Sequence, residues 1–387
     1  MNLLILPWLA LLFSQGSPNF ESQLIDDNVS IGYGIVVGDV DGDGKPDLIL
    51  ADKKQFVWYR NGDWKRFVLT ENLTERDNVC IAARDIDGDG MVEIAVGAQW
   101  NPGETSDEAQ SGSVHYLIRP DDPTQLWTPV QLPHEPTVHR MYWVKTGRAS
   151  YQLIVLPLHG RGNKAGEGAG VKVIAYEKPV NPKDPWKTTL IDESMHLTHN
   201  MTSKDLGVGG GETIFIGGKE GVKSFSIQDN NWFAGPTQES PPGHQSFGEL
   251  ALAMIPGRGM LLAGVEPMHG NQVAAYVATQ ESNQTQRVVL DKSLKEGHGI
   301  ITGDFLGNGT VQIVAGWRTP NEAGDIGIKL YEPVNENYTE FKAHWIDQNG
   351  MATESLTAAD LNGDGKLDII ASGRATNNLK IYWNRRE

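Results

Sequence analysis

The sequence contains a single cysteine among its 387 residues, so no disulfide bond can form within the chain. Cys80 stands in the apolar run 79–83 without a charged neighbour, which predicts a small buried residue rather than a reactive thiol. A chain of this length can bury enough apolar surface to fold without disulfides. Long apolar runs are also missing, because no stretch after residue 13 is long and apolar enough to cross a bilayer.

Basic residues are scarce as well. The chain has 33 lysines and arginines against 49 acidic residues, which gives a net charge of −16. This balance argues against nucleic acid or an anionic membrane as a partner, because both require basic patches. Much of the acidic excess is concentrated in short aspartate-rich segments, a pattern that indicates cation binding.

The N-terminus has the features of an export signal. An apolar run over residues 3–13 is followed by small and polar residues at 14–17, although no basic residue precedes the run. The run is too short to span a membrane, and the small residues suit cleavage after Gly16. We therefore expect residues 1–16 to be a signal peptide and the protein to be secreted or periplasmic.

Internal repetition indicates the fold. Three segments are nearly the same sequence: DVDGDGKPDLILAD at 39–52, DIDGDGMVEIAVGA at 85–98 and DLNGDGKLDIIASG at 360–373. A degenerate fourth copy covers 303–317, and three weaker copies without the acidic segment cover 139–158, 199–218 and 249–266. Because each acidic segment lies between two apolar runs, we expect it to form the turn of a β-hairpin. The chain then contains seven hairpins.

Two further strands follow most hairpins. The third is rich in aromatic and β-branched residues, as at 56–60, and the fourth begins with an aromatic residue, as at 64–69. Four short strands in a repeat of roughly 50 residues are typical of a propeller blade. The last repeat stops after its third strand, and the N-terminal segment 23–26 matches the missing fourth. We therefore predict an all-β fold, a seven-bladed β-propeller with four-stranded blades in one domain over residues 20–387, its ring closed by the N-terminal strand.

The acidic turns have the pattern D-x-D-G-D-G-x-x-D/E, which places oxygen donors at alternate positions around a glycine turn. Several oxygen donors on a flexible loop suit calcium better than magnesium. The predicted ligands, which include main-chain carbonyls at the lysine and methionine positions, are Asp39, Asp41, Asp43, Lys45 and Asp47; Asp85, Asp87, Asp89, Met91 and Glu93; and Asp360, Asn362, Asp364, Lys366 and Asp368. We expect Ca²⁺ to be structural in these loops.

Two other interpretations of the acidic turns are possible. An EF-hand requires a glutamate at the twelfth position of the loop, where this chain has Leu50, Val96 or Ala371, so that interpretation fails. A solvated acidic turn without metal is the other alternative, and the threefold recurrence disfavours it. The degenerate turn at Asp304 and Asn308 is expected to bind weakly or not at all.

A second set of polar residues is expected at the opposite end of the hairpins, where first strands begin and second strands end. The first strands of a propeller line its central channel, so these residues meet in one layer. Aligned across the blades, the candidate catalytic residues are His139, His159, His199, His298, Glu249, Glu354, Lys219, Arg318 and Arg374. Converging ionisable groups cost desolvation energy without partners, which favours a functional role.

This layer has three interpretations. The first is a His/Glu site for one transition metal such as Zn²⁺, with Lys219, Arg318 and Arg374 as clamps for anions or hydroxyls. The second is metal-free catalysis, with a histidine as general base and Glu249 or Glu354 as acid. The third is a hydrated channel lined by paired polar residues.

Other residues are expected near the same layer. His244 and His269 flank the fifth hairpin, and the glycine-rich segment 160–170 is expected to form a rim loop over the channel. Trp100 and Trp317 follow second strands, where they either stack on a sugar or pack between blades.

The chain resembles two known families. The acidic turns followed by IAVGA or IVAGW resemble the FG-GAP/VCBS repeat family of calcium-binding propellers. The segments HRMYW from His139, LIVLPLHG ending at Gly160, and HLTHNM before the fourth hairpin resemble the propeller domain of the aldos-2-ulose dehydratases. Those enzymes are metal-dependent and dehydrate keto-sugars such as anhydrofructose. The resemblance implies that His139, His159, His199 and His298 line a sugar-processing pocket.

Two functions from different classes are compatible with the sequence. One is a lyase or dehydratase that acts on a keto-sugar or another carbohydrate with a metal at the channel mouth. The other is a non-catalytic, calcium-stabilised module that binds a glycan or a protein at the channel face.

Overall fold

The computed structural model describes residues 18–207, 210–235, 237, 246–278 and 285–386. These residues contain 28 β-strands and no helix, so the described chain has no helix of the length and apolar character that crossing a membrane requires. The expected signal peptide, residues 1–16, and His244 lie outside the described residues.

The strands form seven four-stranded sheets, here called blades 1 to 7. The first three blades comprise β2 (Gly34–Gly38), β3 (Asp47–Ala51), β4 (Gln55–Tyr59) and β5 (Arg66–Glu71); β6 (Cys80–Arg84), β7 (Glu93–Ala98), β8 (Ser113–Ile118) and β9 (Thr128–Leu132); and β10 (Val138–Gly147), β11 (Ser150–Pro157), β12 (Val173–Glu177) and β13 (Lys187–Asp192).

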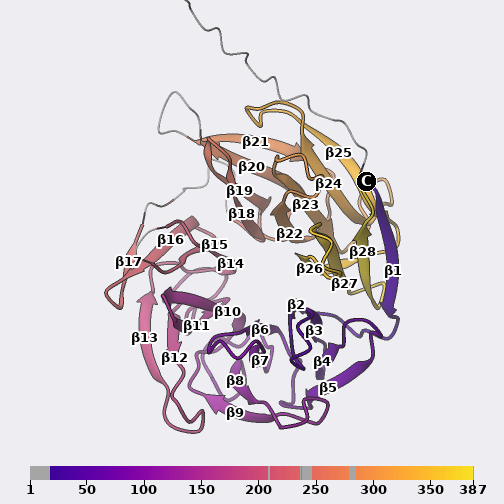
Figure 1. Ribbon diagram of the computed structural model, residues 1–387. Coiled ribbons are helices and arrows are strands. Elements are labelled where there is room, and N and C mark those ends of the chain that lie inside the picture. The colour runs from indigo at the N-terminus through magenta and orange to yellow at the C-terminus, as the bar shows by residue number, and fades with distance from the viewer. Residues whose placement is uncertain (1–17, 208–209, 236, 238–245, 279–284, 387) are drawn as a thin grey trace, which may run out of the picture.

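The remaining blades comprise β14 (Thr198–Lys204), β15 (Thr213–Gly218), β16 (Gly221–Gln228) and β17 (Asn231–Ala234); β18 (Leu250–Ile255), β19 (Gly259–Glu266), β20 (Gln272–Ala278) and β21 (Thr285–Asp291); β22 (Gly297–Gly303), β23 (Gln312–Trp317), β24 (Gly327–Pro333) and β25 (Phe341–Gln348); and β26 (Thr353–Ala359), β27 (Asp368–Gly373) and β28 (Asn378–Asn384) with β1 (Phe20–Asp26). In blades 1 to 6 the strand order follows the chain. The prediction of a seven-bladed propeller with four-stranded antiparallel blades is confirmed (Figure 1).

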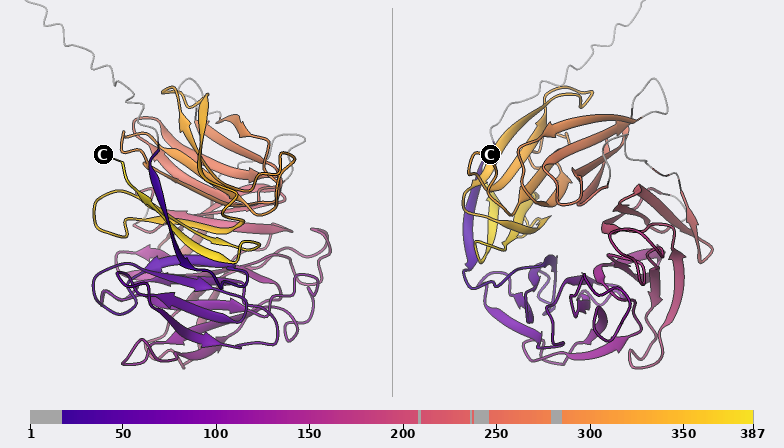
Figure 2. Two further views of the ribbon diagram at one scale, coloured as in Figure 1. Left: turned by 90° about the vertical axis from the view of Figure 1, so that its right-hand side faces the viewer. Right: turned by 180° about the vertical axis from the view of Figure 1, so that it is seen from behind.

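Blade 7 combines the two ends of the described chain. Its outer strand is β1, which pairs antiparallel with β28 along its whole length. Figure 2 shows the indigo β1 running beside the yellow C-terminal strands. The segment 23–26, expected to supply a fourth strand, lies within β1.

A tyrosine–aspartate contact joins blade 7 to blade 1. The hydroxyl of Tyr59 on β4 donates to Asp26 Oδ2 at the end of β1, at 2.6 Å. The same kind of contact joins blades 5 and 6 and blades 6 and 7, in Tyr331–Asp291 at 2.9 Å and Tyr382–Asp347 at 2.8 Å. The junction between blades 7 and 1, which contains β1, is therefore joined by the same kind of side-chain contact as two junctions between blades that follow one another in the chain.

The core lies between the blades. Among the described residues the buried apolar side chains form seven clusters, and each joins two neighbouring blades. Between blades 1 and 2, for example, Trp58 on β4 packs in one cluster with Ile94 on β7. Second strands such as β3 and β7 are buried along their whole length, which explains why they are continuous apolar runs rather than alternating ones.

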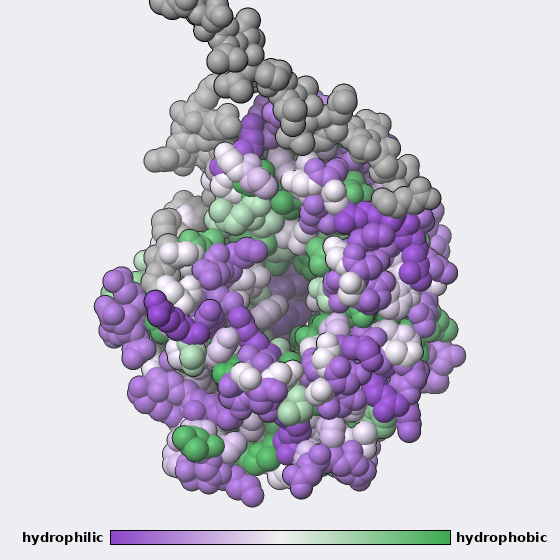
Figure 3. Space-filling view, viewed as in Figure 1, coloured by the Kyte–Doolittle hydropathy of each residue, from purple (hydrophilic) through white to green (hydrophobic). Residues whose placement is uncertain are grey.

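The first strands surround a central channel. β2, β6, β10, β14, β18, β22 and β26 contact one another in that order, and β26 contacts β2. The channel contains a cavity of about 600 Å³ lined by residues of all seven first strands, and Figure 3 shows the molecule hollowed at its centre. The aspartate turns follow the C-terminal ends of β2, β6 and β26, whereas His139, His199 and His298 stand at the N-terminal ends of β10, β14 and β22. The two sets of polar residues therefore lie at opposite ends of the first strands.

One buried histidine away from the channel makes stability sensitive to acid. His115 on β8 is buried, and its Nδ1 has no hydrogen-bond partner among the described residues. Burial lowers its pKa from 6.5 to about 4. The unfolded chain takes up this proton near its ordinary pKa and the folded chain does not, so stability is lost as the pH falls from 6.5 towards 4. We expect the free energy of unfolding, measured with urea, to fall between pH 7 and pH 5 by on the order of 2 kcal/mol more in the wild type than in His115→Gln. Equal falls in the two proteins would contradict this account.

Candidate functional site

Four blades have an irregular residue at the start of the first strand. The pairing register between first and second strands shifts at His139, His199, His298 and Glu354. Such β-bulges change the direction of a side chain and are common next to functional sites. Together with Glu249, which directly precedes β18, these residues bring ionisable side chains from five blades to one end of the channel.

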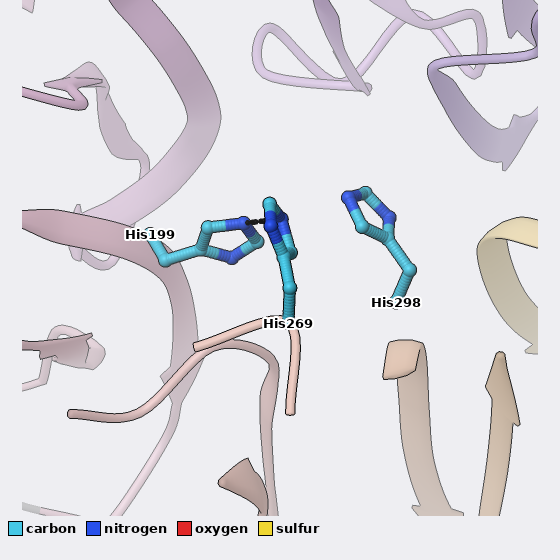
Figure 4. A group of neighbouring side chains, drawn as sticks. All are labelled: His199, His269 and His298. Atoms are coloured by element: carbon cyan, nitrogen blue, oxygen red, sulfur yellow. Dashed lines mark hydrogen bonds between the residues drawn. The ribbon is translucent and has the colours of Figure 1, made fainter. Parts of the chain in front are cut away.

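Three histidines from blades 4, 5 and 6 face one another (Figure 4). His199 and His298 belong to first strands, and His269 lies in the connection between β19 and β20. The ring centroids of His199 and His269 are 4.5 Å apart, and those of His269 and His298 are 4.9 Å apart. The Nε2 atoms of His199 and His269 are separated by 2.6 Å, so the two rings must share either a proton or a cation.

The spacing of these three rings fits a metal ion. One potential ligand atom from each of His199, His269 and His298 lies within 4.8 Å of the others. Bonds from zinc to imidazole nitrogen are about 2.0–2.1 Å long, so two nitrogens on one ion lie at most about 4.2 Å apart. The observed limit of 4.8 Å is close to this span, so the three rings could hold one ion.

Two of these rings are held from behind. His298 Nδ1 donates a hydrogen bond of 2.6 Å to the main-chain carbonyl of Glu354. His199 Nδ1 lies 3.2 Å from the Glu249 Oε1 atom, although the two groups lack hydrogen-bond geometry. Metal-bound histidines usually have such a carbonyl or carboxylate partner on the nitrogen away from the metal. In both residues Nε2 is thereby left to face the cluster.

Burial keeps the histidines of this cluster uncharged. Burial and the charge of Arg140 hold the pKa of His139 well below its ordinary value, and burial also lowers the pKa of His199 and His298. Burial and the neighbouring His199 lower the pKa of His269 to about 3. Neutral imidazole is the form that binds a metal ion, so the cluster presents ligands in the right protonation state near pH 7.

The two carboxylates of the layer are both neutralised by arginine. Glu354 is buried and accepts hydrogen bonds of 3.1 Å from Arg318 Nη1 and from Arg374 Nη1. Glu249 is held by Arg140 at 3.4 Å and by the side-chain amide of Asn200. Burial alone raises the pKa of Glu249, but its contacts with His199 and Arg140 outweigh that effect and keep the pKa below its ordinary value. Glu249 is therefore held in its charged form, and Glu354 is paired with two arginines.

His139 lies beside the three facing rings and supports them. Its Nδ1 donates to the carbonyl of His199 at 2.8 Å, and its Nε2 accepts from Arg140 Nη1 at 3.1 Å. Trp100 stacks on its other side, with ring centroids 5.0 Å apart. His139 is therefore a neutral ring with both nitrogens in hydrogen bonds, and its Nδ1 contact holds the backbone of His199 in place.

The aspartate turns at the other end of the first strands share one hydrogen-bond pattern. Asp39 accepts from the backbone N–H groups of Gly42 and Gly44 at 2.7 and 2.8 Å, and Asp85 and Asp360 make the same contacts in their own turns. Gly42 and Gly44 have φ angles of +78° and +80°, which glycine adopts without strain. The turn thereby curls so that acidic side chains gather around one point.

The gathered acids fit a hard cation. In blade 1, Asp39, Asp41 and Asp43 offer ligand atoms within 4.8 Å of one another. Burial raises the pKa of Asp47 to about 7, and burial together with the Asp43 charge raises the pKa of Asp41. A bound divalent cation removes this penalty, because it favours the charged form of every carboxylate around it. The residues present therefore fit calcium.

The turns are not equivalent. In blade 2, Arg119 lies 3.3 Å from Asp89 Oδ2 and 3.1 Å from Glu93 Oε1, so a guanidinium competes for two of the predicted ligands. In blade 6, Leu306 and Gln312 stand where blade 1 has its second and last aspartates, and the Gln312 amide oxygen accepts from Leu306 N.

Two family models match the chain. A model of FG-GAP-like repeats matches residues 39–96 and 304–371, which contain all three aspartate turns. A model of the aldos-2-ulose dehydratase β-propeller domain matches residues 111–279, which contain His139, His199 and His269. The chain is related to the propeller of aldos-2-ulose dehydratase.

One curated relative and two solved structures extend this comparison. The aldos-2-ulose dehydratase of Phanerodontia chrysosporium is 21% identical over 305 residues, which are 70% of this chain and 33% of that protein, so the match spans about a third of the relative's length. A structure of BBS1N in complex with ARL6DN has a TM-score of 0.56 at 15% identity and covers 95% of this chain and 97% of its own. A structure of the mitotic checkpoint complex has a TM-score of 0.58 at 10% identity with 99% of both chains covered. At such identities the two structures show a shared fold alone.

In this dehydratase-related propeller, most of the predicted channel residues contact one another, whereas the side chains of Lys219 and His159 have no contact with the histidine cluster among the described interactions. Lys219 donates to the carbonyl of Gly166 in the rim loop at 3.0 Å and lies 3.6 Å from Glu167. His159 forms an isolated backbone bridge with Leu197, and its Nδ1 has no hydrogen-bond partner among the described residues. The rim loop that follows the second strand of blade 3 therefore takes Lys219 away from the cluster.

Arg140 and Asn200 are not among the residues predicted from the sequence, although both contact Glu249. Each directly follows a predicted histidine on a first strand, in the segments HRMYW and HLTHNM. Their positions could have indicated this role, because a polar residue next to a predicted histidine on a first strand also lies near the channel. His269, expected near the layer, supplies the third facing ring.

Asp43→Ala is expected to remove one calcium from the dehydratase-related propeller. Asp43 supplies a carboxylate to the blade 1 turn, and Asn308 occupies the equivalent position in the degenerate blade 6 turn. At free calcium 100 times Kd, one site adds about 2.7 kcal/mol of stability. Elemental analysis and thermal unfolding with calcium and with a chelator should show this loss in Asp43→Ala and none in Asn308→Ala. Equal calcium content in the two variants would contradict a site in blade 1.

Proposed function

We propose that this chain is a secreted, calcium-stabilised propeller that holds one transition-metal ion on His199, His269 and His298 and acts as a carbohydrate dehydratase. One observation carries the proposal: three neutral imidazoles from three successive blades face one another at one end of the channel. Neutral histidines with open coordination positions are typical of a catalytic zinc site. The relation to aldos-2-ulose dehydratase makes a keto-sugar such as anhydrofructose the expected substrate.

Different residues of the layer could carry out the separate steps of a dehydration. Loss of water from a keto-sugar requires that a base takes the proton from the carbon next to the carbonyl. The hydroxyl group on the following carbon then leaves as water, after it has taken up a proton from that protonated base. When bound, the ion acts as a Lewis acid on the keto oxygen. The one lone pair of His139 is on Nε2, where it accepts from Arg140, so His139 serves as the base only once Arg140 has turned away from it. Arg318 and Arg374, both bound to Glu354, are the proposed N–H donors to sugar oxygens.

A non-catalytic glycan-binding module is the second candidate. The observation in its favour is that Glu249 and Glu354 are both paired with arginines among the described residues, so neither carboxylate stands unpaired at the channel mouth. Such a layer still offers hydrogen-bond donors to hydroxyl groups, and Trp100 offers an aromatic ring beside it.

The two candidates differ in turnover. Zinc-loaded protein is mixed with anhydrofructose, and the unsaturated carbonyl product is followed by ultraviolet absorbance while binding is measured by calorimetry. The dehydratase predicts product that forms with zinc and not after chelation. Binding without product supports the module, and neither binding nor product contradicts both.

A further inference from the structure

Arg140 stands at the boundary between the histidine cluster and the channel cavity. It follows the bulged His139 on β10, its side chain is 14% exposed, and it lines the cavity of about 600 Å³. Its Nη1 donates to His139 Nε2 and to the His139 carbonyl, both at 3.1 Å, and its Nη2 lies 3.4 Å from Glu249 Oε1.

These contacts leave part of the guanidinium unused. An arginine side chain has five N–H donors, and no described residue accepts a hydrogen bond from Arg140 Nε. None of its nitrogens is both shielded from solvent and without a partner, so the unused donors are open to the channel. The partner at Glu249 is also shared with Asn200 and His199.

The charge balance of the layer favours an anionic ligand. Three guanidinium groups face three carboxylates, in the pairs Arg140–Glu249, Arg318–Glu354 and Arg374–Glu354 with Glu296 beside Arg318. These three guanidinium groups and three carboxylates balance, so none of the six is left over to offset an added cation. A divalent ion on three neutral rings adds two positive charges in a buried place, and an uncompensated buried charge is costly. A ligand that brings a negative charge offsets this cost.

We propose that the channel mouth selects sugars that carry a carboxylate, and that Arg140 binds that carboxylate. The inference rests on the proposed function insofar as the ligand is a sugar held beside the metal. Arginine recognises a carboxylate through two parallel N–H···O bonds, a geometry that lysine lacks. The cavity is large enough for a monosaccharide that reaches from the histidines to Arg140.

Calorimetry on the zinc-loaded protein tests this selection. The probes are D-glucuronate, D-galacturonate and D-gluconate, each compared with the neutral sugar of the same configuration. We expect at least one acid to bind about tenfold more tightly than its neutral counterpart, since a hydrogen bond to a charged group is stronger than one to a neutral group. The preference should vanish in Arg140→Met, shrink in Arg140→Lys, and persist in Arg148→Met, which removes the same charge from the exposed tip of the same hairpin.

The outcomes separate this inference from the proposed function. Equal affinity for acids and neutral sugars in the wild type overturns the inference, as does an unchanged preference in folded Arg140→Met. If Arg140→Met does not fold because Glu249 loses its partner, Arg140→Lys decides, and an undiminished preference there overturns the inference. A preference that depends on Arg140 without turnover of any sugar contradicts the dehydratase alone, because zinc content and binding are measured without reference to catalysis.

Discussion

Replacing His199 and His298 together by glutamine is expected to abolish both zinc binding and turnover. His298 is anchored at Nδ1 by the Glu354 carbonyl, and His199 has the Glu249 carboxylate beside its Nδ1, so each ring offers Nε2 to the cluster. The double change removes two of the three ligands. Loss of an outer-shell partner alone typically weakens a metal site 10- to 100-fold, so loss of two ligands should exceed about 100-fold in affinity and in turnover. Zinc content by elemental analysis and the rate of product formation measure the two effects.

His196→Gln is the matched control for this prediction. His196 is three residues from His199, but its ring is 42% exposed and is bonded to Glu220 outside the cluster. The control should keep about one zinc per chain and its turnover. A folded double variant that retains zinc at the wild-type level would show that the ion binds elsewhere in the protein.

Removal of residues 1–27 is expected to cause the largest loss of stability, because we predict that β1 closes the ring. The deletion strips β28 of its only outer neighbour among the described strands and exposes an unpaired sheet edge. It also removes the acceptor of the buried Tyr59 hydroxyl at 2.6 Å and that of Trp383 Nε1 at 2.7 Å. Each lost hydrogen bond costs about 0.5–1.5 kcal/mol, and the deletion also removes Phe20 and Ile25, which pack against the clusters on either side of blade 7. A total of several kcal/mol corresponds to a fall in Tm on the order of 10 °C.

The matched control removes residues 1–17 and keeps β1. Thermal unfolding in the presence of calcium should give the wild-type Tm for the shorter deletion and the lowered Tm for the longer one. Identical melting of the two deletions would mean that β1 is not needed to close the ring, and that the contacts between β2 and β26 hold it instead.

The repeats made most of the fold predictable from sequence. The aspartate turns mark hairpins in blades 1, 2 and 7, and a constant offset from the turn locates His298 and Glu354 at the start of their first strands. His139, His199 and Glu249 stand at the same place, at or directly before the start of the first strand, although their blades lack the aspartate turn. The alignment with the other blades located them because the length of the first strand belongs to the hairpin and not to the metal loop.

The contacts within the site were less predictable, because they depend on segments between the repeats. Lys219 and Arg374 occupy equivalent positions after second strands, yet Arg374 reaches Glu354 while Lys219 is bound by the rim loop at Gly166. Arg140 contacts Glu249, which is 109 residues away in the sequence, and the repeat pattern does not predict such a contact. The bulges that direct the histidines also leave no mark in the hydrophobic pattern.

The central claim is that three histidines hold one metal ion at the channel mouth, and anomalous diffraction at the zinc edge tests it most directly. Crystals grown from zinc-loaded protein should show one strong peak about 2.0–2.1 Å from a nitrogen of each of His199, His269 and His298. A map without a peak among these rings, from protein that is folded and fully exposed to zinc, would contradict the claim. The 2.6 Å contact between His199 and His269 would then be a shared proton alone.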